Sequence, residues 1–221
     1  MTQTVEAARD TKERILDAAE ALFAAQGFAA RSLRQVTQGA GVNLAAVNYH
    51  FQSKEALFLA VLQRKIEPIN ARRLALLDGL ESQLPESPPS LEEVVRAFFR
   101  PVFEAQMLGV EVGGFPKLLG RVSTEPGDGV GRVFGGAFGQ VLERFSRAFR
   151  RALPGLTADD LAWGAHFMVG SMAHYLAAGE LLKLMSGGRL DGWDVEEAYE
   201  RLVGLAAGGV GGKAGSRGGR G

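Results

Sequence analysis

Cysteine is absent from this chain of 221 residues, and histidine occurs only three times. Without cysteine, disulfides, thiolate metal sites and cysteine nucleophiles are excluded. There is no zinc-protease motif and no nucleophile elbow. Ser171 and His174 share a helix face, but no orienting acid accompanies them, so a hydrolase is kept only as a remote alternative. We therefore expect no enzyme, no metal site and no cofactor.

Long apolar runs and a net charge are missing as well. No stretch of about 18 apolar residues and no basic leader followed by an apolar run is present, so we expect a cytoplasmic protein without membrane contact. The 25 basic and 25 acidic side chains balance, which argues against bulk electrostatic coating of nucleic acid. Residues 1–66 carry eight basic and six acidic side chains. Because the chain as a whole has no net charge, any DNA binding must be confined to one part of its surface.

Helical periodicity runs through most of the chain, and no convincing strand alternation occurs. Capping signals and glycine or proline breaks set the expected helix limits. We predict a break or kink at Pro68, because proline removes a backbone donor. The predicted helices are 10–27, 32–39, 44–50, 54–66, 69–84, 91–108, 115–122, 130–152, 158–186 and 194–206. The predicted fold class is all-α.

Three regions follow from these limits. Residues 1–66 would form an N-terminal three-helix domain with a helix-turn-helix, and residues 67–207 a helical-bundle domain. Residues 208–221 contain eight glycines. This composition offers too little apolar surface to offset the entropy of ordering, so we expect a disordered Gly-rich tail.

The most informative segment is 32–51, where two short helices flank a tight glycine turn. A second, exposed helix in this arrangement can enter the major groove of DNA. The segments that carry a family resemblance are Ser32–Val36 (SLRQV), Ala40–Asn43 (AGVN) and Val47–Leu57 (VNYHFQSKEAL). They resemble the N-terminal domain of the TetR family of repressors over about residues 11–60. Two departures are Thr37, where the family usually has alanine, and Asn48, at a commonly aromatic position.

The exposed face of the second short helix is the expected DNA-reading surface. Asn48 would pair with adenine, while Leu44 or Ala45 would touch a thymine methyl group. The resemblance implies that Tyr49, His50 and Lys54 contact phosphates, and Ser32 and Arg34 would add further phosphate contacts. The complete expected set is Ser32, Arg34, Asn43, Leu44, Ala45, Asn48, Tyr49, His50 and Lys54.

A single helix-turn-helix reads too few base pairs for useful specificity, so we expect a homodimer on a palindromic double-stranded operator. The helices predicted over 158–186 and 194–206 resemble the dimer interface of the family. The alternative is that the first of them is buried within the monomer. The expected interface residues are Leu161, Ala165, Met172, Leu176, Tyr199 and Leu202.

Nine of the thirteen phenylalanines follow residue 97 and offer a lining for an apolar effector pocket, although aromatic residues at helical spacing can equally be plain core. The expected pocket residues are Phe99, Phe103, Met107, Phe115, Leu118, Arg121, Phe138, Phe167, Met168 and Met172. Residues 118–121 (LLGR) resemble what fatty-acid-responsive members of the family carry. We therefore hypothesise a fatty acid or acyl-CoA effector, with Lys117 or Arg121 as partner of the carboxylate.

The function expected from these features is that of a repressor that binds DNA sequence-specifically. A small apolar or amphiphilic effector would release it from its operator. The effector would act by a population shift transmitted through the region of Pro68. The alternative is a helical protein-interaction module without ligand control, since a helical fold does not by itself fix function.

Overall fold

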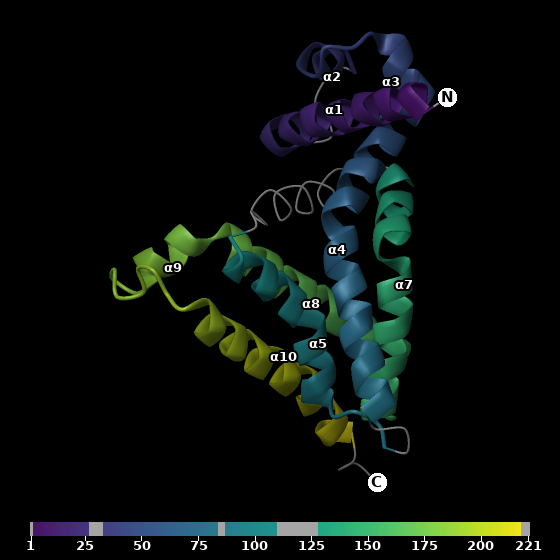
Figure 1. The fold of residues 1–221 in the computed structure, drawn as a ribbon. Coiled ribbons are helices and arrows are strands. Elements are labelled where there is room, and N and C mark those ends of the chain that lie inside the picture. Colours follow the sequence, from purple (N-terminus) through teal and green to yellow (C-terminus); the bar gives the residue numbers. More distant parts are fainter. Residues whose placement is uncertain (1, 27–32, 84–86, 110–127, 218–221) are drawn as a thin grey trace. The chain divides into compact units, whose positions relative to one another are not determined.

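The computed structural model describes residues 2–26, 33–83, 87–109 and 128–217, and every regular element in these ranges is a helix (Figure 1). The helices are α1 (Thr2–Gln26), α2 (Leu33–Ala40), α3 (Leu44–Phe51), α4 (Lys54–Gln83), α5 (Leu91–Met107), α7 (Asp128–Ala152), α8 (Ala158–Ala177), α9 (Gly179–Met185) and α10 (Val195–Arg217). The predicted all-α fold class is confirmed. The helix predicted over 115–122 lies outside the described residues.

The chain divides into two compact units. The first contains α1, α2, α3, α4 as far as Glu67 and α7 as far as Phe138. The second contains α4 from Pro68, α5, α7 from Gly139, α8, α9 and α10. The two units therefore share the helices α4 and α7.

The first unit is held together by apolar side chains that recur on one face of each helix. Phe23 of α1 meets Phe58 of α4 edge to face, with ring centroids 5.1 Å apart. The other buried apolar residues of this unit are Ile15, Leu16, Ala19, Val36, Ala40, Val47, Phe51, Leu57, Val61, Leu62, Ile66 and Phe138. Because α2 and α3 have only eight residues each, their stability must come mainly from this packing.

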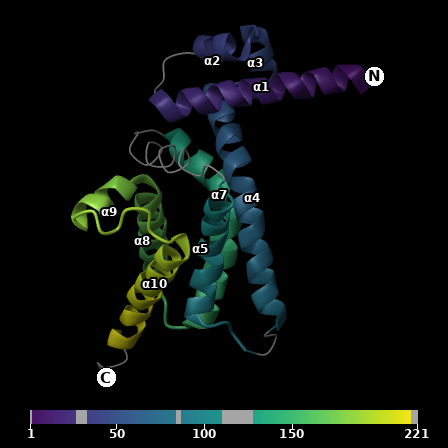
Figure 2. The same cartoon turned by 60° about the vertical axis from the view of Figure 1, so that its left-hand side comes forward.

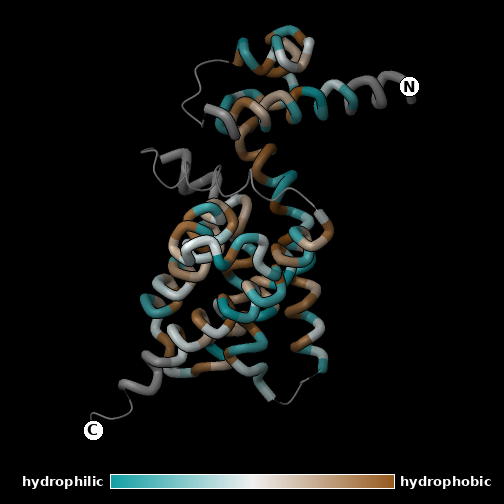
Figure 3. Tube along the Cα trace, turned by 90° about the vertical axis from the view of Figure 1, so that its left-hand side faces the viewer, coloured by the Kyte–Doolittle hydropathy of each residue, from teal (hydrophilic) through white to brown (hydrophobic). Residues whose placement is uncertain are grey.

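The second unit is a bundle in which α10 packs against α5 and α8 (Figure 1, Figure 2). Capping boxes begin α5 at Ser90 and α8 at Thr157. Phe98 of α5 meets Phe145 of α7 at 5.3 Å between ring centroids, and Phe103 stacks on Tyr175 of α8 at 5.0 Å. Hydrophobic and hydrophilic residues are interspersed along these helices (Figure 3). This is expected for helices that bury one face and expose the other.

Of the break or kink predicted at Pro68, the break does not occur, because α4 continues through this residue to Gln83. Proline costs an interior helix one backbone hydrogen bond. Ile66 and Ile69 on either side are both buried. Since tertiary packing supplies most of the stability of a helix, burial on both sides offsets the lost bond.

Two further limits differ from the predictions in the second unit. The helix expected over 158–186 is interrupted at Ala178, where the indole of Trp193 packs so closely on Gly179 that a Cβ there would lie 2.5 Å from the ring. The tail expected to be disordered from residue 208 instead continues α10 to Arg217. Glycine allows the close approach, because a Cβ on Gly211 would lie 3.3 Å from the Leu91 side chain. Residues 218–221 lie outside the described residues.

Candidate nucleic-acid interface

The turn between α2 and α3 is built around Gly41, whose φ of 63° lies in the left-handed region that favours glycine. The amide of Val42 donates to the carbonyl of Thr37 at 3.0 Å and closes the end of α2. Arg14 of α1 crosses to this turn, and its Nη2 donates to the carbonyls of Ala40 at 2.6 Å and Gly41 at 3.1 Å. Sequence reasoning missed Arg14, since only the fold brings it beside a turn that follows 26 residues later.

Asn43 begins α3 as its N-cap. Its φ of −87° and ψ of 164° are extended, and its Oδ1 accepts the amide N–H of Ala46 at 2.9 Å. An N-cap of this kind satisfies one of the amide groups that the first helical turn leaves without a partner. The Asn43 side chain therefore orients α3, whatever else it contacts.

The two faces of α3 differ sharply. Val47 and Phe51 are buried in the core, whereas Leu44, Ala45 and Asn48 are exposed and Tyr49 is 81% exposed. His50 is half-buried and meets the Tyr49 ring edge to face at 5.1 Å between centroids. The helix thus presents two aliphatic residues, an amide and a phenol to solvent from a firmly packed base.

Two basic residues flank this exposed face within the same unit. Arg34 is exposed on α2, and half-buried Lys54 is the first residue of α4. The hydroxyl of Ser53 caps α4 by accepting the amide N–H of Ala56 at 3.0 Å. Ser32, the remaining member of the predicted DNA-binding set, lies outside the described residues.

An ion-pair network joins α1 to the first part of α4. Arg64 contacts three acids of α1, Glu13, Asp17 and Glu20, at 3.2, 2.7 and 2.6 Å, and Lys65 contacts Glu20 at 2.7 Å. Burial opposes ionisation of Glu20, but the hydrogen bonds from Lys65 and Arg64 outweigh it and lower the pKa of this carboxyl. The network therefore joins α4 to α1, the helix against which α2 and α3 pack.

Of the described members of the predicted effector set, Phe167 and Met168 line one groove on the second unit. Phe99 and Phe103 are fully buried in the core of the second unit, with Met168 and Met172 also buried. Phe167, in contrast, is 61% exposed on α8, and Met107 is 43% exposed at the end of α5. Phe138 belongs to the first unit. Phe115, Lys117, Leu118 and Arg121 lie outside the described residues.

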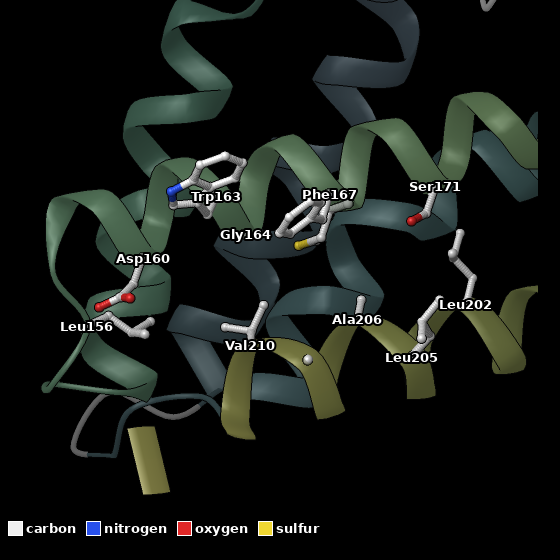
Figure 4. Close-up of a pocket in the computed structure, with 12 residues that line it drawn as sticks. Leu156, Asp160, Trp163, Gly164, Phe167, Ser171, Leu202, Leu205, Ala206 and Val210 are labelled. Atoms are coloured by element: carbon white, nitrogen blue, oxygen red, sulfur yellow. The ribbon is translucent and has the colours of Figure 1, made fainter. Parts of the chain in front are cut away.

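A groove of about 370 Å³ runs between α8 and α10, with Trp163, Gly164 and Phe167 on one side and Leu205 and Val210 on the other (Figure 4). Trp163, Phe167 and Leu205 are between 56% and 67% exposed. Such a contiguous apolar surface is typical of a protein–protein contact.

Only part of the predicted dimer set lies on the surface. Leu161, Ala165 and Leu176 are half-buried. Met172, Tyr199 and Leu202 are buried within the protomer, and Leu202 also lines the groove between α8 and α10. The sequence pattern missed the exposed Trp163 and Leu205, because helical periodicity alone does not distinguish an apolar residue that packs inside the protomer from one that stays at the surface.

Two parts of this chain match known protein domains. Residues 15–61 match the tetR family of bacterial regulatory proteins, and residues 96–209 match the tetracyclin repressor-like C-terminal domain. The curated relatives are HTH-type transcriptional regulators. They include SrpR of Pseudomonas putida, 39% identical over 67 residues, which are 30% of this chain and 32% of that protein. They also include AcrR of Shigella flexneri, 39% identical over 56 residues, which are 25% of this chain and 26% of that protein. The chain thus spans half or less of the length of these regulators.

Solved structures share the fold over nearly the whole chain. The TetR-family regulator SCO4454 of Streptomyces coelicolor superposes with a TM-score of 0.59 at 20% identity, covering 95% of each chain. The fatty acid degradation regulator FadR of Bacillus halodurans gives 0.56 at 16% identity, covering 89% of this chain and 98% of that one. In the described part of the chain, no helix is long and apolar enough to span a membrane. With an N-terminal helix-turn-helix and a C-terminal helical unit that both match it, the chain belongs to the TetR family, whose members are DNA-binding transcriptional regulators and not enzymes.

Proposed function

We propose that the protein is a cytoplasmic repressor that binds a palindromic operator as a homodimer and leaves it when a small apolar or amphiphilic effector binds. The observation that carries the DNA-binding part is the geometry of α3. Its buried face is locked by Val47 and Phe51, and its N-terminus by the Asn43 cap, while its outer face is open to solvent. A helix held in this way enters the major groove without further ordering.

The residues on the outer face divide into two roles. Asn48 reads an adenine by a bidentate hydrogen bond, and Leu44 or Ala45 contacts a thymine methyl group. Arg34, Tyr49, His50 and Lys54 contact phosphates and set the position of the helix on the duplex. The exposure of Asn48 and Tyr49 supports these roles.

The apolar groove between α8 and α10 is the surface that we assign to the dimer. Trp163, Phe167 and Leu205 would lose their exposed area against the same residues of a second copy, as a two-fold interface requires. Dimerisation places two α3 helices about one DNA turn apart, or a multiple of it.

The effector that we propose is a fatty acid or acyl-CoA. Support comes from the phenylalanine-rich second unit and from the fold shared with the fatty acid degradation regulator of Bacillus halodurans. Since α4 contributes to both units, it would carry the coupling between effector and DNA. A coupling of about 1–3 kcal/mol, about 5- to 150-fold in affinity, is typical of such linkage.

Fluorescence anisotropy with a labelled duplex from the region upstream of the gene tests the proposal, with a scrambled duplex of equal composition as comparison. Wild-type protein should bind the first duplex selectively and more weakly as salt increases. Asn48→Ala should reduce selectivity, and Lys54→Ala should reduce the slope of affinity against salt. Lys183→Ala in the second unit removes an equal charge and should change neither. Equal binding of both duplexes by all variants would contradict the proposal.

A further inference from the structure

Arg73 of α4 is the largest side chain that is almost completely buried in the second unit, with 1% exposure. Its Nε donates to the carbonyl of Phe98 at 2.8 Å, and its Nη1 donates to Oδ1 of Asn70 at 3.0 Å. The third nitrogen of the guanidinium, Nη2, donates to the thioether sulfur of Met172 at 3.8 Å. Arg73 therefore lies where α4, α5 and α8 meet.

Among the described residues, no carboxylate pairs with Arg73. The described arginines that do form ion pairs all have side chains at least 26% exposed; they are Arg64, Arg72, Arg96, Arg100, Arg144, Arg147, Arg151 and Arg201. Arg73 is thus the least exposed of the described arginines and has no counter-charge. A buried charge without an ionic partner is costly.

Two of the three edges of the guanidinium have a structural explanation. The bond from Nε to the Phe98 carbonyl ties α4 to α5, and Nη1 donates to the side-chain amide oxygen of Asn70 within α4. A thioether is a weak acceptor. An oxygen atom of a ligand would therefore form a stronger hydrogen bond with Nη2 than Met172 does.

The surroundings of Nη2 are apolar and adaptable. The Phe98 ring lies under the guanidinium at 4.4 Å, and Phe145 packs against Phe98. Met172 is a flexible, unbranched side chain that can change rotamer without a backbone shift. Desolvation lowers the pKa of Arg73 to about 9, so the group is still cationic at neutral pH.

From this geometry we infer that Arg73 is the anchor for an anionic oxygen group, carboxylate or phosphate, at one end of an apolar effector, which replaces Met172 at Nη2. This inference rests on the proposed effector control and names the chemistry that the effector must have. The anion would connect α4, α5 and α8 through one charge. No such role was expected for Arg73, since charged residues are seldom fully buried.

The test compares three twelve-carbon ligands on the full chain: dodecanoate, dodecyl phosphate and dodecanol. Isothermal titration should show that at least one anionic ligand binds wild-type protein about tenfold more tightly than the alcohol, as expected for a hydrogen bond to a charged group. Arg73→Met should bind that ligand and the alcohol equally. Arg72→Met makes the same change at the neighbouring, half-exposed residue and should keep the preference.

Three outcomes would overturn the inference: no binding of any of the ligands to wild-type protein, equal binding of all three, or a preference that survives in Arg73→Met. A second measurement needs no variant. Dodecanoate labelled with carbon-13 at the carboxyl carbon should stay ionised to lower pH when bound to wild-type protein than in water, and an unlowered carboxyl pKa would also overturn the inference. Operator binding, measured separately by anisotropy, distinguishes failure of this site from failure of the proposed repressor function.

Discussion

The Nη2 atom of Arg14 lies 2.6 Å from the carbonyl oxygen of Ala40, so a side chain of α1 closes the last turn of α2. The carbonyls at the end of a helix have no partner within the helix, and a cation there also interacts favourably with the helix dipole. Arg14 thereby fixes the turn from which α3 departs. Its contribution to DNA binding would be through geometry alone.

Replacing Arg14 with methionine should lower the free energy of unfolding by about 1–2 kcal/mol, because charge-assisted hydrogen bonds at the end of α2 are lost. Urea denaturation measures this effect, and anisotropy should show weaker operator binding. Arg201→Met is the control, since Arg201 is an exposed residue of α10 that pairs with Glu197 one turn earlier. Equal stability of the two variants would show that the contact with Ala40 contributes nothing.

Gly41→Ala should destabilise the first unit by about 1–3 kcal/mol. Alanine would be forced into the left-handed region, and its Cβ would lie 3.0 Å from Nη2 of Arg14. Gly79→Ala is a matched control in the interior of α4, where a Cβ meets nothing within 4 Å. There the change should stabilise the helix by up to about 1 kcal/mol. Thermal unfolding of both variants measures these two effects. A Gly41→Ala protein as stable as wild type would contradict the claim that alanine is strained at this turn.

Acid should weaken the attachment of α1 to α4. The pKa of Glu20 is lower in the folded protein than its ordinary value of 4.5, so its contribution is present above pH 4.5 and is lost as the pH falls through the folded-state value. Glu20→Gln should therefore be less stable than wild type at pH 7, by about 1 kcal/mol or less for such a half-exposed group. The difference should shrink toward pH 3.

Denaturation at a series of pH values measures this change. Glu55→Gln alters an exposed glutamate of the same unit outside the ion-pair network and serves as control. A gap between wild type and Glu20→Gln that stays constant from pH 7 to pH 3 would argue against the assigned role of Glu20.

Phe167→Asp should convert the dimer into monomers, because it places a charge in the apolar groove that we assign to the interface. Analytical ultracentrifugation at micromolar concentration should show a loss of dimer and anisotropy a loss of operator affinity. Leu108→Asp changes an 81% exposed apolar residue just after α5 that does not line the groove, and it should remain dimeric. A dimeric Phe167→Asp protein would place the interface elsewhere.

Local sequence was sufficient to predict most of the DNA-binding half. The Asn43 cap and the Gly41 turn act within a few residues, so α2 and α3 begin and end close to where the pattern places them. The same holds for the capping box at Ser90. Signals of this kind involve neighbours in the chain and are visible without a fold.

Other features depended on residues far apart in the sequence. The continuation of α4 through Pro68 and of α10 past Gly208 depends on packing, with buried Ile66 and Ile69 beside the proline and Gly211 close to Leu91. Periodicity could not separate buried Phe99 from exposed Phe167. The sequence by itself determined the helices, the helix-turn-helix and the family. Only the tertiary structure decided that Arg14 reaches Ala40 and that Arg73 meets Met172, 99 residues away, because those contacts exist only once the helices have packed.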